Sequence, residues 1–213
     1  MVLRQITAMA DATPSPADRF RDAYENQPAW EIGRLQPALA AVADRIQGSI
    51  LDAGCGTGDC ALFFAERGHE VYGVDFVADV IALARTKAAD RGLQAHFLVL
   101  DATSLDQLPR SFDNVIDSGL FHVLSDPDRT RYVAAIQRVL RPGGRLWLLC
   151  WSDQEPPKPG PRRISRRELQ EAFAAGWTIE SLEDVRMEAA AHVPPGTFDP
   201  GGPRAYRLVA CRT

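Results

Sequence analysis

The chain has 213 residues, of which 46% are hydrophobic, with a formal net charge of −4 and a pI near 5.6. This length and composition predict one globular domain with a sizeable core, and the acidic balance argues against binding to a nucleic-acid backbone. No apolar run reaches the roughly 18 residues of a membrane span, and the first residues lack the apolar segment of a signal peptide. Four cysteines without a C-x-x-C pair predict reduced thiols and a cytoplasmic protein: Cys55, Cys60, Cys150 and Cys211.

The chain begins with an expected flexible tail over residues 1–16, and either Met1 or Met9 is its native first residue. A short helix is expected over 18–24. Phe20 and Tyr24 are spaced i, i+4 and lie on one face of this helix. A segment with two prolines, Gln27 to Pro37, precedes a helix over 38–46. On its composition alone, this segment predicts a loop in which Trp30 fills the core.

The stretch from Ser49 to Phe76 reads as a strand over 49–54, a glycine-rich turn, a helix over 57–67 and a strand over 70–75. Glycines at alternate positions let the backbone turn tightly and approach a ligand, and the helix start presents free N–H groups. Asp75, at the end of the second strand, can accept hydrogen bonds from both hydroxyls of a ribose. The stretch therefore predicts a site for an adenosine-bearing cofactor.

The glycine spacing and a nearby acid decide between cofactors. A dinucleotide fingerprint is G-x-G-x-x-G, whereas this chain has G-x-G-x-G with Asp52 two residues ahead, and an anion there disfavours a pyrophosphate. The pattern D-x-G-x-G-x-G, matched by Asp52, Gly54, Gly56 and Gly58, resembles motif I of the class I S-adenosylmethionine-dependent methyltransferases. The resemblance covers nearly the whole chain and implies S-adenosyl-L-methionine as cofactor and S-adenosyl-L-homocysteine as product.

Further motifs extend this resemblance to particular residues. The segment from Trp30 to Pro37 is similar to the W-[DE]-I-G-x-x-Q-P segment of small-molecule methyltransferases of the thiopurine and heterocycle type, where it forms part of a lid. Leu35 is a mild departure from that pattern. The resemblance implies that Trp30 packs on the methionine side of the cofactor, that Gln36 bonds its polar end, and that Asp101 and Ala102 frame the adenine. An alternative for Asp101 is the cap of a helix. The cofactor-binding residues expected in this way are Trp30, Gln36, Asp52, Gly54, Cys55, Gly56, Gly58, Asp75, Phe76, Asp101, Ala102 and Ser118.

The remaining elements alternate between helices and strands. Helices are expected over 77–91, 128–140 and 165–174, and strands over 95–100, 112–118, 145–151, 177–187 and 205–212, with proline-rich loops at 153–161 and 192–203. This order, with the resemblance, predicts an α/β fold: a Rossmann-like, doubly wound, seven-stranded and mostly parallel sheet with helices on both faces and the last strand antiparallel. Residues 17–213 would form one domain, divided into an N-terminal lid (17–48), a cofactor-binding core (49–151) and substrate-side loops with closing strands (152–213).

The end of the fourth strand is where an acceptor is expected, because ligands of open α/β sheets bind at the carboxyl ends of the strands. His122 is the candidate general base, or else it caps a helix or lines the cofactor site. The expected substrate pocket consists of Tyr24, Phe121, His122 and Trp151. No cluster offers metal ligands, and position 117 onward lacks the Asn/Asp-Pro-Pro-aromatic tetrad that holds a flipped base amine.

These observations favour methyl transfer by in-line displacement to O, N or S of a small aromatic or heterocyclic acceptor. A monomer or homodimer is expected, with no nucleic-acid or membrane partner. Two alternatives stay open at this point: a nicotinamide-dependent oxidoreductase, and a non-catalytic module that binds S-adenosylmethionine.

Overall fold

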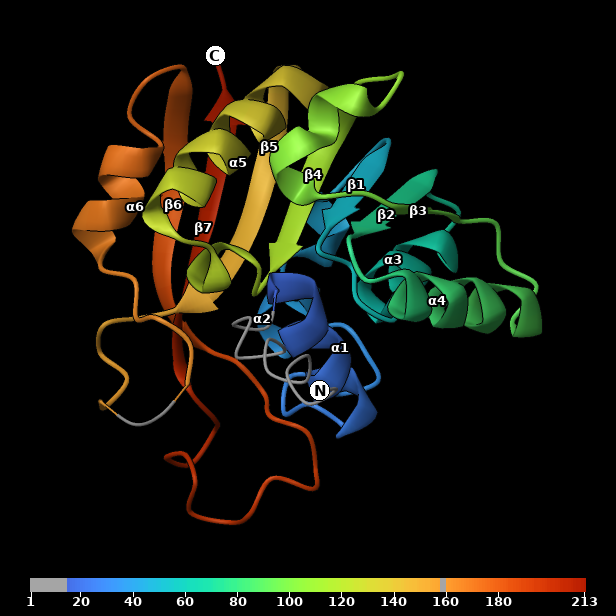
Figure 1. Ribbon diagram of the computed structural model, residues 1–213. Coiled ribbons are helices and arrows are strands. Elements are labelled where there is room, and N and C mark those ends of the chain that lie inside the picture. Colours follow the sequence, from blue (N-terminus) through green and yellow to red (C-terminus); the bar gives the residue numbers. More distant parts are fainter. Residues whose placement is uncertain (1–14, 158–159) are drawn as a thin grey trace, which may run out of the picture.

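The computed structural model describes residues 15–157 and 160–213 and contains one seven-stranded sheet (Figure 1). Its strand order is β3-β2-β1-β4-β5-β7-β6. The strands are β1 (Ile50–Ala53), β2 (Val71–Asp75), β3 (His96–Val99), β4 (Phe112–Ser118), β5 (Leu140–Trp151), β6 (Trp177–Arg186) and β7 (Arg204–Arg212). The first five strands run parallel, and β7 is antiparallel to both β5 and β6. The predicted fold class, with its antiparallel last strand, is confirmed.

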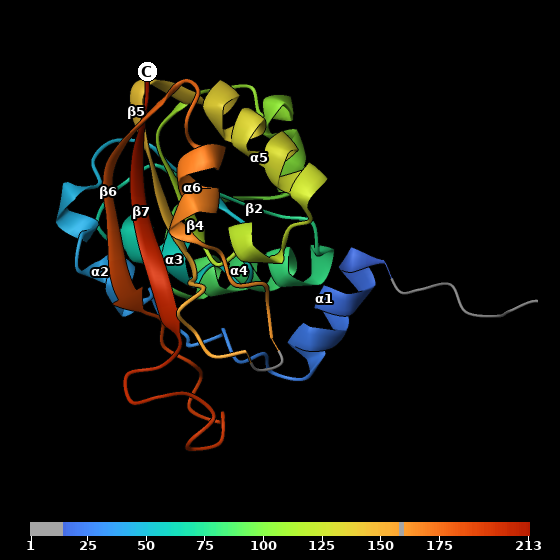
Figure 2. The ribbon, with the colours of Figure 1, turned by 90° about the vertical axis from the view of Figure 1, so that its left-hand side faces the viewer.

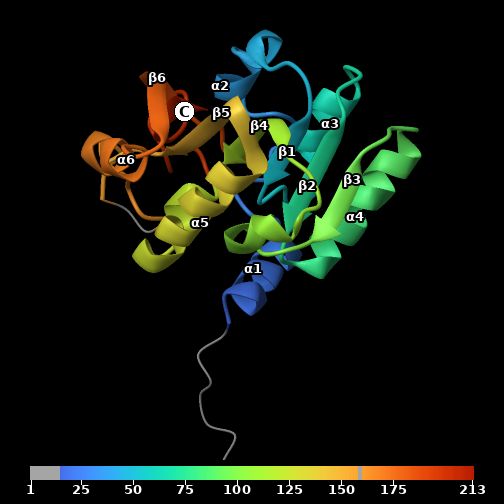
Figure 3. The same cartoon turned by 90° about the horizontal axis from the view of Figure 1, so that it is seen from above.

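Helices cover both faces of this sheet (Figure 3). One face packs against α2 (Pro37–Ala40), α3 (Asp59–Ala65) and α4 (Ala78–Asp90), and its core includes Leu62, Phe64 and Trp147. The other face packs against the 3-10 helix η2 (Ala102–Gln107), α5 (Asp126–Val139) and α6 (Arg166–Ala172). β1 is buried along its whole length because β2 and β4 flank it and helices cover it from both sides.

The carboxyl ends of the parallel strands point to one edge of the molecule, which is also where the N-terminal helix lies. α1 (Pro16–Glu25) lies below the tip of β4 in Figure 1, and the connection from β6 to β7 extends beyond the same edge (Figures 1 and 2). α1 begins with a capping box in which Ser15 and Asp18 satisfy each other's backbone N–H groups. The segments with the fewest regular elements therefore surround the edge at which ligands of such sheets bind.

Three local expectations differ from the structure. The helix expected over 38–46 divides into α2 and the 3-10 helix η1 (Ala43–Arg45), because the backbone of Val42 leaves the helical region at φ −121° and ψ 5°. Leu39, Val42 and Ile46 still face the core, so packing on the sheet outweighs helix continuity. β5 begins at Leu140, five residues before its expected start, and the 3-10 helices η2 and η3 (Phe121–Val123) were not expected. The tail expected over 1–16 lies mostly outside the described residues.

Candidate functional site

The glycine-rich turn between β1 and α3 forms the centre of the site. Gly54, Gly56 and Gly58 all have positive φ angles, of 71°, 51° and 87°, which side chains with a Cβ rarely adopt. A Cβ on Gly58 would lie 2.9 Å from the side chains of Ala84 and Phe97, so this glycine also sets how closely α3 approaches α4 and β3. Within this tight turn, the N–H groups of Gly54 and Gly58 donate to the carbonyls of Val74 and Cys55.

Asp75 at the tip of β2 lies directly against this turn. Its Oδ2 accepts the N–H of Gly56 at 3.1 Å, and its Oδ1 accepts the N–H of Val77 at 2.9 Å. Burial raises the pKa of this carboxyl, against the effect of the backbone N–H groups. Each oxygen keeps a lone pair beyond these bonds, so the carboxylate is held in place and can still accept hydrogen bonds from a ribose diol.

Asp52 points in a different direction from Asp75. Its carboxyl is fully buried, and its Oδ2 accepts the N–H of Ala61 in the first turn of α3 at 3.1 Å. Burial, with the nearby charges of Asp117 and Asp75, raises its pKa to about 7 although Cys60 and Ala61 donate to it. The visible role of Asp52 is to join β1 to the start of α3, and its expected contact with the methionine part stays a prediction.

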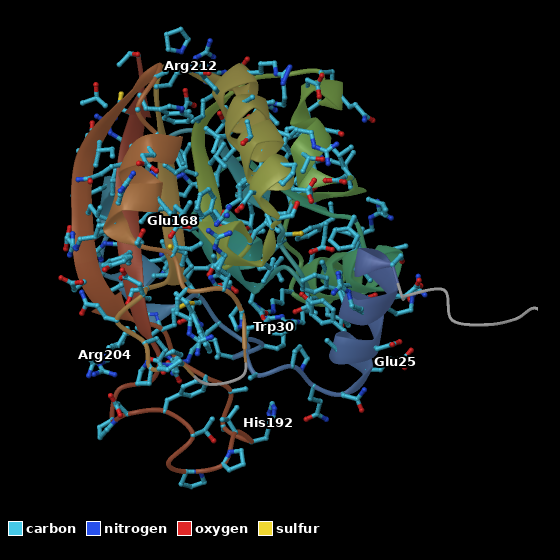
Figure 4. The ribbon with its side chains drawn as sticks, turned by 60° about the vertical axis from the view of Figure 1, so that its left-hand side comes forward. Glu25, Trp30, Glu168, His192, Arg204 and Arg212 are labelled. Atoms are coloured by element: carbon cyan, nitrogen blue, oxygen red, sulfur yellow. The ribbon has the colours of Figure 1, made fainter. Side chains whose placement is uncertain are left out.

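An aromatic cover lies over the glycine turn. The Tyr24 hydroxyl would be 2.5 Å from a Cβ on Gly56, and it accepts a 3.4 Å hydrogen bond from Nε1 of Trp30. Phe20 contacts both Trp30 and Phe76 through their rings, at centroid distances of 6.1 and 5.7 Å. Trp30 is nevertheless 45% exposed, and Figure 4 shows it between α1 and the loop that carries His192. The structure thus brings Tyr24, Trp30 and Phe76 together beside the turn.

The segment after Trp30 is bonded to the glycine turn. Glu31 accepts a 2.7 Å hydrogen bond from the hydroxyl of Thr57, which in turn accepts one of 2.6 Å from Nζ of Lys87. Lys87 also pairs with Asp59 at 3.0 Å. Burial and the neighbouring Asp59 raise the pKa of Glu31. This network fixes the lid segment to the start of α3.

The same segment is bonded at its other end to the β6–β7 connection. The carboxamide of Gln36 is buried, donates to the carbonyl of Glu188 at 3.0 Å and accepts its N–H at 2.8 Å. Ala190 donates its N–H to the carbonyl of Ala29 at 2.8 Å. Both functional atoms of Gln36 are therefore engaged with backbone, and its expected contact with the polar end of the cofactor stays a prediction.

At the end of β4, Asp117 organises the turn that carries Ser118 and His122. Its carboxylate is fully buried and accepts the N–H groups of Gly119, Leu120 and Phe121 and the hydroxyl of Tyr132. Burial raises its pKa to about 6, and these donors oppose the rise. These bonds tie the backbone between Ser118 and His122 to the end of β4.

His122 is buried in this turn, and its Nδ1 accepts the N–H of Trp151 at 3.0 Å. That bond requires a lone pair on Nδ1, so the proton of the neutral ring lies on Nε2. Burial first, and then the positive charge of Arg163, lower its pKa to about 3. This geometry favours a neutral hydrogen-bond donor over the general base expected from the sequence.

Trp151 lies beside His122, which was expected in the same pocket, and it also contacts Phe198 and Arg163, which the sequence did not suggest. Its ring contacts His122 at 6.2 Å and Phe198 edge-on at 5.6 Å, and the guanidinium of Arg163 lies 4.8 Å above it. Phe121, expected in the same pocket, is not there. Its ring is buried in the core against Phe173 at 5.8 Å, because the η3 turn directs it away from His122 and toward α6.

Four further residues were expected to bind the cofactor: Cys55, Asp101, Ala102 and Ser118. Cys55 is buried in the turn, and Ala102 is buried at the start of η2. Asp101 is exposed and its Oδ1 accepts the N–H of Thr103 at 2.8 Å, which makes it the cap of η2, as the alternative held. Its contact with adenine stays a prediction, as does that of Ser118.

Several residues of the site were missed by sequence reasoning. Glu31 lies inside the quoted lid motif, and Asp117 precedes a glycine by two residues at a strand end, so both carried a signal. Arg163, Met187 and Phe198 lie in or beside long loops whose path no periodicity encodes.

Within residues 15–157 and 160–213, no group of three or more acidic, histidine or cysteine side chains is arranged to hold a metal ion. In the same part of the chain, no helix is long and apolar enough to span a membrane.

Comparison with protein families matches residues 50–144 to a methyltransferase domain. A 2-heptyl-1-hydroxyquinolin-4(1H)-one methyltransferase of Mycobacteroides abscessus is 33% identical over 190 residues, which is 83% of this chain and 84% of the relative. A demethylmenaquinone methyltransferase of Thermus thermophilus is 42% identical over 132 residues, which is 61% of this chain and 56% of the relative.

Two solved structures are similar over nearly the whole chain. One comes from work on the conversion of a disulfide bond into a thioacetal group during echinomycin biosynthesis, with 37% identity, a TM-score of 0.79 and coverage of 91% of this chain and 92% of the other. The second is a 1,6-didemethyltoxoflavin-N1-methyltransferase of Burkholderia thailandensis with bound S-adenosylhomocysteine, with 24% identity, a TM-score of 0.70 and coverage of 98% of each chain. The latter likeness concerns the fold.

Proposed function

Because the chain belongs to the class I S-adenosylmethionine-dependent methyltransferases and acts on small molecules, we propose that its acceptor is an aromatic or heterocyclic compound methylated on O, N or S. The observation that carries this proposal is the aromatic wall at the end of β4 and β5, where the rings of Trp151, Phe198 and His122 adjoin. Aromatic side chains favour flat, apolar acceptors through offset and edge-to-face contacts. The names of relatives, which include a hydroxyquinolone and a demethylmenaquinone methyltransferase, support an aromatic acceptor.

The glycine turn and its neighbours fit S-adenosylmethionine. We assign the turn of Gly54 to Gly58 to the methionine part, the carboxylate of Asp75 to the ribose hydroxyls, and the ring of Phe76 to the adenine. A Cβ at Gly56 would fill the space beside the Tyr24 hydroxyl, which is why close approach requires glycine there. The cofactor supplies an electrophilic methyl group on a sulfonium centre.

The residues of this chain would act by orientation and by excluding water. Holding an acceptor in line with the bond to the methyl carbon lowers the barrier by about 7–11 kcal/mol in favourable cases. Asp117 fixes the turn beneath the acceptor, and the aromatic cover of Tyr24 and Trp30 lies over the glycine turn. An aromatic ring near a sulfonium contributes about 0.5–2 kcal/mol of cation binding. The exposed ring of Trp30 would supply such a contact.

A methyl-labelled cofactor offered with a panel of acceptors tests the proposal. The panel contains a 1-hydroxyquinolin-4(1H)-one, a quinol, a thiophenol and a heteroaromatic N–H, against an aliphatic thiol and an aliphatic amine of similar size. We expect label in the aromatic acceptors only, and a loss of about tenfold or more in kcat/KM for Trp151→Ala. Phe63→Ala, an aromatic change on α3 outside the acceptor wall, is the control. Label confined to the aliphatic acceptors, or equal rates for both variants, would refute the acceptor class.

The cofactor assignment is tested separately by calorimetry with S-adenosylhomocysteine. Asp75→Ala removes a charged acceptor of ribose hydrogen bonds, so we expect affinity to fall about 10- to 100-fold. Asp79→Ala, a change to an exposed acid at the start of α4, should leave the affinity unchanged. Equal affinities of Asp75→Ala and the unmodified protein would contradict the assignment.

A further inference from the structure

The imidazole ring of His122 has one N–H that is available to a ligand. Since Nδ1 accepts the N–H of Trp151, the ring proton lies on Nε2, and the side chain is only 6% exposed. Among residues 15–157 and 160–213, no group forms a hydrogen bond with Nε2. This N–H is therefore available to donate a hydrogen bond to a ligand that binds beside it.

The donor lies where an acceptor molecule would bind. Nε2 is 3.9 Å, and Cε1 3.5 Å, from the position that a Cβ on Gly119 would take, and the methyl of Met187 is 3.7 Å from the same point. Gly119 follows the carboxyl end of β4, the edge at which ligands of this kind of sheet bind. The aromatic wall of Trp151 and Phe198 continues from this point.

Arg163 supplies a positive charge that acts on His122, and the carboxylate of Asp117 at the same turn is held by hydrogen bonds. From the loop before α6, the guanidinium of Arg163 over the Trp151 ring acts on the imidazole and lowers its pKa. From β4, the carboxylate of Asp117 is occupied by three backbone N–H groups and the Tyr132 hydroxyl. The neighbouring parts of β5 and the β6–β7 connection present Trp151 and Met187, which carry no charge. The local field therefore favours an anion.

No other described side chain near the turn is placed to remove a proton from an acceptor at Gly119. Burial raises the pKa of Tyr24, whose hydroxyl lies at Gly56. The carboxylate of Glu31 is bonded to Thr57 at the start of α3. Burial also raises the pKa of the Cys55 thiol. A base is therefore missing where the sequence pattern had suggested one.

We propose that the acceptor binds as an anion, with its heteroatom deprotonated before binding, and that the Nε2–H of His122 donates a hydrogen bond to it. The acceptors are thus acidic groups such as N-hydroxy heteroaromatics, acidic phenols or enols, and aromatic thiols. This inference rests on the function proposed above and narrows its substrate class. His122 is then a binding donor that fixes the orientation of the nucleophile and takes up no proton.

The reaction balances without a base. The anionic heteroatom forms a bond to the methyl carbon, the carbon–sulfur bond breaks, and its electron pair stays on sulfur. The positive charge of the sulfonium and the negative charge of the acceptor cancel, so both products are neutral at the reacting atoms. The acceptor loses its proton to solvent before it binds, and none is released in the chemical step.

The dependence of kcat/KM on pH tests this inference with two substituted 1-hydroxyquinolin-4(1H)-ones whose pKa values are well separated. We expect one ascending limb whose midpoint moves with the pKa of the acceptor and is the same in the His122→Gln variant, which keeps a donor. His122→Phe should lose about 10- to 100-fold in kcat/KM with unchanged affinity for S-adenosylhomocysteine. A limb that stays at one pH for both acceptors and disappears in His122→Gln would show that the histidine is a base, and would overturn the inference.

A binding measurement provides a second readout that does not depend on turnover. A chromogenic nitrophenol bound together with S-adenosylhomocysteine should show a lowered apparent pKa, measured by absorbance. In His122→Phe, the preference of the site for the anion over the neutral phenol should fall about tenfold or more, so the lowering of the pKa should be smaller. A pKa that is unchanged or raised on binding overturns the inference while leaving aromatic methyl transfer intact. Absence of label in every aromatic acceptor of the panel would instead overturn the proposed function.

Discussion

Two buried carboxyls carry much of the electrostatic character of the site. Burial raises the pKa of Asp52 to about 7 and that of Asp117 to about 6, so both titrate well above the usual range of aspartate. Asp52 accepts one backbone N–H in the first turn of α3, and Asp117 accepts three in the turn that leads into η3. Their ionisation therefore connects pH to the geometry of both halves of the site.

Replacing Asp52 should make stability less dependent on pH. A carboxyl whose pKa is raised in the folded state contributes its full stability below the unfolded pKa of about 4, and this contribution is lost as pH rises through about 7. Asp52→Asn keeps an oxygen for the N–H of Ala61 and carries no charge. We expect its Tm, measured by calorimetry, to fall less between pH 4 and 7 than that of the unmodified protein.

Asp113→Asn is the matched control because its pKa moves the other way. Burial raises the pKa of Asp113, but hydrogen bonds from Arg141 and Ser49 outweigh burial and lower it to about 2. Its contribution is present above the unfolded pKa and is lost as pH falls toward 2, so Asp113→Asn should cost stability at neutral pH. Identical pH profiles for the two variants would contradict the opposite shifts.

At the scale of elements, the lid segment from Pro28 to Gln36 is the part that joins distant regions. It is bonded to the glycine turn through Glu31 and to the β6–β7 connection through Gln36 and Ala29. The resemblance of this segment to a known lid motif pointed to the cofactor, and Trp30 does lie beside the turn. The partner of Gln36 could not be predicted, because Glu188 is 152 residues away in an irregular segment.

Gln36 and Arg34 both bind Glu188, but Gln36 is buried and Arg34 is exposed. We expect the loss of the Gln36 side chain to cost more. Gln36→Ala leaves the carbonyl and N–H of Glu188 without their partner, so we expect a loss of about 1–3 kcal/mol in the free energy that orders the lid. Arg34→Ala breaks an exposed ion pair with the same residue and should cost about 1 kcal/mol or less. Hydrogen exchange of residues 28–36 and 187–190 measures both effects. Equal protection in the two variants would place the ordering elsewhere.

Sequence periodicity predicted the existence of all seven strands and the larger helices, because buried parallel strands and amphipathic helices leave clear patterns. Element ends were less predictable. α5 begins at Asp126, two residues before the expected start, because Ser125 caps it and Pro127 fits its first turn. The division at Val42 and the direction of Phe121 depend on packing across the sheet, which no local pattern contains.

For the molecule as a whole, the inserted strand β7 decides how the chain closes. It pairs with β5 along Arg145 to Trp151 and with β6 along Trp177 to Arg186, so the last strand in sequence is an inner strand of the sheet. Leu208, Val209 and Ala210 are fully buried within it. The final residues of the chain are therefore part of the core.

Deleting residues 204–213 should prevent cooperative folding. The deletion removes both ladders of β7 and exposes the edges of β5 and β6 at once. We expect no cooperative thermal transition by circular dichroism, whereas removal of Thr213 alone, which lies beyond β7, should leave the Tm unchanged. A cooperative transition in the longer deletion would show that the first five strands fold independently.

The bonds of Gln36 and Ala29 to Glu188 and Ala190 also have a consequence for the catalytic cycle. The cover on the cofactor side and the loop on the acceptor side share these hydrogen bonds, so neither can swing open without disturbing the other. Both products would then leave through one opening event, and its frequency would limit turnover in the way that product release limits many enzymes with lids. A bulky acceptor that wedges this loop outward would accordingly shorten the residence time of spent cofactor.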